Sequence, residues 1–280
     1  MSNRGEIRRP ASLGRALRRG FCAAYDQLGW VVGVTLGSFV GTALVVSLSV
    51  WAANLAGVAS GPLRVLIPLP GALVYYLCAV GAFYYAGRSA AYQHPAPGDF
   101  WTGVRVLFRP ALALFAVDAL VAGVLLGDAV FFLALGSARN SGLFAALGVL
   151  CAYLAVVWAT MCQYHLPLLV AQLDMESGPR PAVVIRKAFL LTADNPGFTA
   201  TLFLAIIAIA VLCALPALIG TAIVFLGATA FILTHSLREL FVRYGVVEEE
   251  PDLVEEKPWR LPDSWRKRAG SEDAHDPPAR

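Results

Sequence analysis

Charged residues are scarce in this chain. Asp, Glu, Lys and Arg make up 15% of its 280 residues and apolar residues 58%, whereas soluble domains carry about 25% charged residues. The mean hydropathy is +0.65, and a water-soluble globule of this length could not bury so much apolar surface. The composition also excludes collagen, a coiled coil, a disordered chain and a disulfide-stapled secreted domain. The net charge of +3 is too small to indicate a nucleic-acid partner.

Metal and catalytic motifs are also missing from the sequence. It contains no P-loop, no HExxH and no GxSxG. The cysteines form no CxxC pair and show no Cys/His spacing typical of zinc, so we expect them to pack as small apolar side chains. The sequence therefore predicts no catalytic residue, no metal site and no cofactor. We do not expect an enzyme, although a membrane-embedded lipid enzyme stays open. The five cysteines are Cys22, Cys78, Cys151, Cys162 and Cys213.

Long apolar runs are what the chain has in place of charge. A helix needs about 20 mostly apolar residues to cross a bilayer, and backbone groups in lipid must pair internally, which favours helices. We therefore predict an all-α polytopic membrane helical bundle with six transmembrane helices, in which Pro216 and Gly220 turn the last hairpin. The first run is too long for the core of a signal peptide, so we expect it to be retained. The runs are about Gly29–Ala53, Leu66–Ala86, Pro110–Leu133, Leu143–Leu169, Phe198–Leu215 and Ala217–Ser236.

Lysine and arginine fall almost entirely on one side of this predicted bundle. Of the 22 such residues, only Arg64 and Arg139 lie in the loops of the opposite side. Because cytoplasmic flanks of membrane helices collect Lys and Arg, we expect a multi-pass protein of the bacterial plasma (inner) membrane with both termini in the cytoplasm.

Three regions of different composition follow from this. Residues 1–27 form a cytoplasmic basic amphipathic segment, residues 28–245 the six-helix transmembrane domain, and residues 246–280 a tail. The tail is rich in acidic residues and proline, so we expect it to be disordered. It could be a solvated linker, touch the membrane surface through its Trp-Arg clusters, or bind a partner.

An Arg-x-x-Phe pair precedes each odd-numbered run. Phe would sit at the acyl boundary while Arg reaches the lipid headgroups, so these residues are predicted interfacial anchors. The repetition suggests three helical-hairpin pseudo-repeats, with coincidence as the alternative. The pairs are Arg18 with Phe21, Arg105 with Phe108, and Arg186 with Phe189.

Glycine recurs every four residues along the first run, at Gly29, Gly33, Gly37 and Gly41. This spacing places the glycines on one helix face, and small residues let helices approach closely in lipid. We expect this row to pack against another span of the same chain. A dimer interface is the alternative.

Two ionisable residues fall inside predicted spans. Asp118 lies about 12 Å into the third run and His165 about 6 Å from the end of the fourth, at 1.5 Å per residue. Antiparallel neighbours could bring them to one height, so they form a candidate intramembrane polar pair. The pair could relay a proton or hold a polar substrate, or it could be a buried hydrogen bond that locks two helices. Pro167 is expected to loosen the helix that carries His165.

Four stretches resemble the YesL-like family of uncharacterised bacterial integral membrane proteins. They are Gly81–Tyr85, Gly98–Arg105, Tyr164–Leu169 and Ile185–Pro196, within a similarity over about residues 15–245. The chain departs from the family in its long tail and in lacking a Gly-Pro step near position 81. The resemblance implies a bundle of five or six spans and an accessory role in transport, often beside carbohydrate-uptake genes. It implies no catalytic residues.

The sequence as a whole predicts a transport-associated protein, either permease-like or an accessory for solute uptake. The alternative is a non-catalytic scaffold that recruits a cytoplasmic partner through the tail. The expected partners are the lipid bilayer and a transport or cytoplasmic protein, with no nucleic acid. Oligomeric state and solute are not predicted.

Overall fold

The computed structural model describes residues 10–55, 57, 66–91, 93–174, 178–215 and 218–247, and within them the chain is all α-helical, as predicted. Of the predicted tail, only Val246 and Val247 are among these residues. The helices are α1 (Leu13–Asp26), α2 (Leu28–Leu55), α3 (Leu69–Ala90), α4 (Gly98–Arg139), α5 (Gly142–Cys162), α6 (His165–Ala171), α7 (Pro181–Asp194), α8 (Pro196–Ala214) and α9 (Leu226–Arg243).

Six helical segments of the described chain are long and apolar enough to cross a membrane, which confirms the predicted number and a multi-pass membrane protein. The third differs in extent, because α4 does not begin at Pro110 but at Gly98 and continues through that proline. Its 42 residues would extend about 63 Å, against about 30 Å of hydrocarbon. The basic stretch before Pro110 is therefore continuous with the helix of the third span. The spans are Leu28–Leu55, Leu69–Ala90, Gly98–Arg139, Gly142–Ala171, Pro196–Ala214 and Thr221–Arg243.

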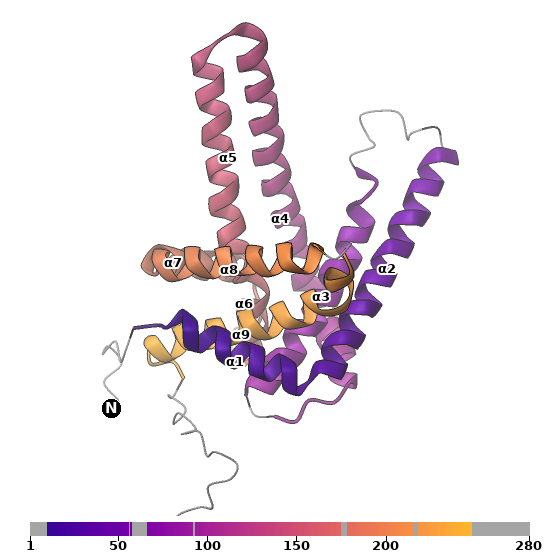
Figure 1. Cartoon of the computed structure of the whole chain (residues 1–280), viewed down its shortest axis with the longest axis vertical. Coiled ribbons are helices and arrows are strands. Elements are labelled where there is room, and N and C mark those ends of the chain that lie inside the picture. Colours follow the sequence, from indigo (N-terminus) through magenta and orange to yellow (C-terminus); the bar gives the residue numbers. More distant parts are fainter. Residues whose placement is uncertain are drawn as a thin grey trace, which may run out of the picture.

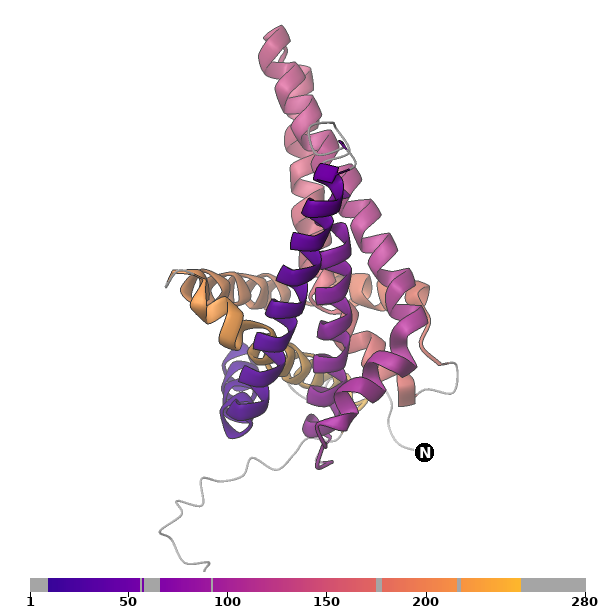
Figure 2. The same cartoon turned by 90° about the vertical axis from the view of Figure 1, so that its right-hand side faces the viewer.

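The three hairpins are not parallel. The α2–α3 and α4–α5 hairpins extend in roughly the same direction, whereas α8 and α9 run across it (Figures 1 and 2). We call the region where α1, α9 and the adjoining part of α3 pack together the base. Helix α1 lies alongside α9 at the base, although the two are at opposite ends of the chain (Figure 1). The base therefore joins the first and third hairpins, and the α4–α5 hairpin projects from it.

Helix α9 is the centre of the base. Its Phe231 and Ile232 are fully buried, and Phe231 meets Trp30 edge to face while Trp30 stacks on Tyr85 of α3 at 3.8 Å between ring centroids. A Cβ atom on Gly20 of α1 would lie 2.7 Å from Ile232 Cα. Glycine at position 20 thus allows the two backbones to touch, as small residues do between membrane helices.

An ion pair holds α1 on α9. The carboxylate of Glu239, which is buried, accepts hydrogen bonds from the Arg15 guanidinium at 2.7 and 3.0 Å and from the Ser12 N–H at 3.3 Å. The start of α1 is therefore fixed to the last helix.

A π-helical turn over Thr221–Phe225 leads into α9. Such turns shift the backbone pairing and leave groups to be satisfied from outside the helix. The Gly227 N–H donates to the Thr35 hydroxyl oxygen of α2 at 3.0 Å, and the Thr35 hydroxyl donates to the Val31 carbonyl at 2.7 Å. A Cβ on Gly227 would lie 2.9 Å from Val31 Cα, so α2 and α9 also touch through backbone.

Candidate functional site

The fourth predicted span is two helices. Helix α5 ends at Cys162 and α6 begins at His165, with Gln163 and Tyr164 in a turn between them. Pro167 explains the position of this break, because proline has no N–H to donate to the carbonyl four residues before it, that of Gln163. Regular bonding resumes where the Leu168 N–H donates to the Tyr164 carbonyl at 2.9 Å. The loosening expected at Pro167 therefore lies one turn upstream.

The third hairpin holds this break in place. The Gln163 amide donates to the Thr199 carbonyl of α8 at 3.2 Å, and the Tyr164 and Thr199 hydroxyl groups are 3.0 Å apart. Tyr164 and Thr199 are both buried. These contacts with α8 thus hold the turn between α5 and α6 in a fixed position.

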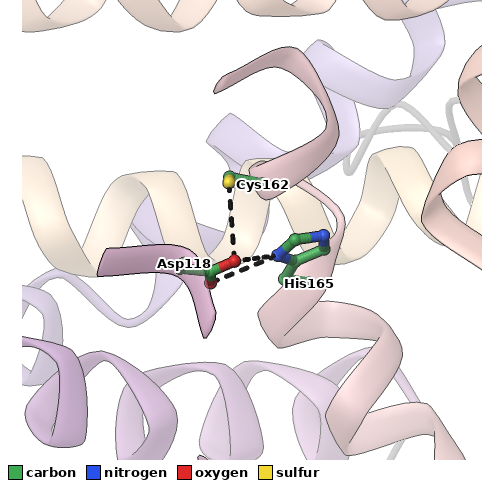
Figure 3. Close-up of side chains that lie close together, drawn as sticks. All are labelled: Asp118, Cys162 and His165. Atoms are coloured by element: carbon green, nitrogen blue, oxygen red, sulfur yellow. Dashed lines mark hydrogen bonds and ion pairs between the residues drawn. The ribbon is translucent and has the colours of Figure 1, made fainter. Parts of the chain in front are cut away.

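Asp118 and His165 meet beside the break. The Nδ1 atom of His165 lies 3.0 Å from Oδ1 and 3.2 Å from Oδ2 of Asp118. Dashed lines mark both contacts in Figure 3. His165 is 1% exposed and the Asp118 side chain 15%. Asp118 comes from the middle of α4, far from either end, because α4 begins well before the third predicted span.

Two aromatic residues complete the surroundings of the pair. The Tyr76 hydroxyl of α3 donates to Asp118 Oδ2 at 3.4 Å, and the Trp158 ring meets the His165 ring edge to face, 5.7 Å between centroids. The other ring nitrogen of His165, Nε2, is buried and has no hydrogen-bond partner in the described part of the chain. Leaving such an atom unsatisfied costs about 1–3 kcal/mol.

Cys162 is the third member of the cluster, and the sequence did not predict it. Its Sγ atom lies 3.8 Å from Asp118 Oδ1 (Figure 3). The available signal was the Cys162-x-x-His165 spacing, which keeps the two residues close together across the short turn between α5 and α6. We missed this spacing because we expected all five scattered cysteines to pack as small apolar side chains.

A cavity of about 820 Å³ lies at the base between α3, α6 and α9. Its wall is mainly apolar, with Arg88, Gln93, Thr234 and Arg238 among its polar members. Helix α6 contributes to both features, because His165 belongs to the polar cluster and Pro167 lines the cavity.

The glycine row of α2 corrects one expectation. A Cβ atom on Gly29, Gly33, Gly37 or Gly41 would meet nothing within 4 Å among the described residues. The row therefore does not pack against another described span of the same chain; instead, α2 approaches α9 through Val31 and Thr35. The dimer alternative stays a prediction.

The predicted interfacial anchors all lie on exposed helix surfaces. Phe21, Phe108 and Phe189 are 47%, 45% and 56% exposed, which a large apolar side chain tolerates when hydrocarbon covers it. Their role at the interface stays a prediction. The partner arginines Arg18, Arg105 and Arg186 are also exposed.

Asn195 directly precedes α8 and contacts the end of α9. Pro196 does occupy the first turn of α8, but the Asn195 side chain makes no capping hydrogen bond there. Its amide group instead donates to the Tyr244 hydroxyl at 2.6 Å and accepts a hydrogen bond from Arg243. Asn195 thus ties the start of α8 to the end of α9.

No family model, curated protein or solved structure matches this chain, so the resemblance to the YesL-like family stays a prediction. The fold and the site define a multi-pass membrane protein with a polar cluster between α4, α5 and α6.

Proposed function

We propose that the chain is a transport-associated membrane protein, permease-like or accessory to solute uptake, in which Asp118 and His165 form the polar centre. The observation that carries the proposal is the buried contact between these two side chains at a helix break. Ionisable groups inside membrane proteins are costly and mark ion, proton or substrate pathways. Broken helices in transporters place backbone polar groups at the binding site.

The cavity supports the same proposal. It offers about 820 Å³ at the base, within the 300–1,000 Å³ typical of small-molecule sites. Because α6 lines the cavity and carries His165, a solute in the cavity and a proton on the pair would act on the same short helix. Orientation with both termini in the cytoplasm remains part of the proposal.

Purified protein in liposomes tests it. An imposed pH gradient, with and without candidate solutes, should drive flux through the wild-type protein. Asp118→Asn preserves the size of the side chain and removes its charge, so flux should fall to the level of protein-free liposomes. Asp128→Asn is the matched control, since Asp128 is exposed on the same helix.

Unfolding measurements separate transport from a structural lock. If Asp118→Asn lowers the unfolding temperature while wild-type and variant flux are equal, the pair is structural and the proposal fails. A chain that lacks residues 248–280 tests the scaffold alternative. A scaffold would lose its cytoplasmic partner on this truncation, whereas a permease would keep its flux.

A further inference from the structure

Three different metal-ligand atoms converge at the break between α5 and α6. They are Asp118 Oδ1, Cys162 Sγ and His165 Nδ1, and all lie within 4.8 Å of one another (Figure 3). We propose that these three residues bind a divalent cation of borderline softness, Zn²⁺ foremost. This goes beyond the proposed function, because the ion can bind whether or not the protein moves a solute.

The distances suit such an ion. In a tetrahedral zinc site, bonds of about 2.0–2.3 Å place the ligand atoms roughly 3.3–3.8 Å apart. The cluster has 3.0 Å between Nδ1 and Oδ1 and 3.8 Å between Sγ and Oδ1. For these two pairs, shifts of a few tenths of an ångström would match the zinc geometry. The third separation, between Sγ and the imidazole nitrogen, is within 4.8 Å and would have to close by up to about 1 Å.

The ligand types select the class of metal. A thiolate with an imidazole favours zinc and copper, whereas Mg²⁺ and Ca²⁺ prefer an all-oxygen set. Charge points the same way. A carboxylate and a thiolate together carry two negative charges, and a divalent cation neutralises them. This matters in a span where an uncompensated charge is costly.

The surroundings suggest an exchangeable ion. Structural zinc sites are closed by four protein ligands, whereas sites with three leave a position for water or substrate. The described residues supply three here. The Tyr76 hydroxyl binds Asp118 from outside the cluster at 3.4 Å, as outer partners of metal ligands commonly do.

Cobalt provides the most direct test. Co²⁺ added to metal-stripped, detergent-purified protein should produce a thiolate-to-cobalt charge-transfer band and the visible bands of a tetrahedral ion, and Zn²⁺ should abolish both. Metal analysis should give about one bound Zn²⁺ per chain for a single three-ligand site. Zn²⁺ should also raise the unfolding temperature of the wild-type protein.

Two cysteine variants make the test specific to the cluster. Cys162→Ser should lose the charge-transfer band and weaken Zn²⁺ binding by more than about 100-fold, since even outer partners of a site are worth 10–100-fold. Cys151→Ser should keep both, because Cys151 lies about three turns earlier on α5 and outside the cluster.

Several results would overturn the proposal. One is a wild-type cobalt spectrum without thiolate character. Another is an unchanged spectrum in Cys162→Ser, and a third is equal loss in Cys151→Ser. If Cys162→Ser does not fold, Cys162→Ala and the zinc dependence of wild-type unfolding replace it. Flux measurements play no part, so the metal site and the transport proposal can fail separately.

Discussion

Helix α9 and the α4–α5 hairpin differ strongly in the share of their residues that the rest of the protein buries. In the apolar window of Thr221–Arg243, 56% of residues are buried within the protein, against 6% in Gly142–Ala171, although the latter is the more apolar. In a soluble protein the most apolar helix would be the most buried. The inversion teaches that α9 is held by protein contacts, including an ion pair and touching backbones, whereas the protein itself buries few residues of the α4–α5 hairpin, the arm.

The largest effect should come from a charge on the arm. Leu150 lies in the middle of α5 and is 52% exposed. Leu150→Arg should make insertion of that span less favourable by about 2.5–3.5 kcal/mol, measured with glycosylation reporters on either side of the span. Val246→Arg is the control, because Val246 is 65% exposed outside the helices and should leave the insertion of the α5 span unchanged. Equal effects at the two positions would contradict a lipid-covered arm.

In the base, adding a single methyl group at Gly20 should lower the free energy of unfolding. Gly20→Ala would put a Cβ atom 2.7 Å from the Ile232 backbone, so α1 must shift away from α9. The expected loss is about 2 kcal/mol, measured by chemical unfolding in micelles. A wild-type free energy of unfolding would show that α1 does not rest on α9 as described.

The contact between α2 and the π-helical turn should be next in size. Thr35→Val preserves shape but leaves the buried Gly227 N–H without its acceptor, which should cost about 1–2 kcal/mol. Thr35→Ser keeps the hydroxyl and should recover most of the stability. If serine and valine behave alike, the hydroxyl does not serve the π-helical turn.

The smallest effect should have the opposite sign. Gly33→Ala adds a methyl group that meets nothing in the described chain, so alanine should stabilise α2 by about 0.5–1 kcal/mol through its higher helix propensity. Unfolding and cross-linking are measured together. A loss of stability together with a loss of cross-linked dimer would instead show that the glycine row is covered by a second copy.

The sequence predicted the spans well because the length of an apolar run is a one-dimensional property that the bilayer thickness selects. It predicted that Asp118 and His165 could lie at one height, since consecutive helices are antiparallel. It missed the break at Gln163, because a proline affects the carbonyl four residues earlier rather than its own position. It also missed the crosswise course of α8 and α9. That course depends on contacts such as Gly20 with Ile232, between residues over 200 positions apart, and hydropathy does not report such contacts.

The ion pair between Arg15 and Glu239, with the hydrogen bond from Ser12 beside it, sets an order of assembly. Ser12 and Glu239 are 227 positions apart. At 5–20 residues per second, the ribosome therefore needs about 10–45 s to reach Glu239 after it has added Ser12. During that interval α1 has no α9 to rest on. The contact between α1 and α9 can therefore form only when synthesis of the last helix is complete.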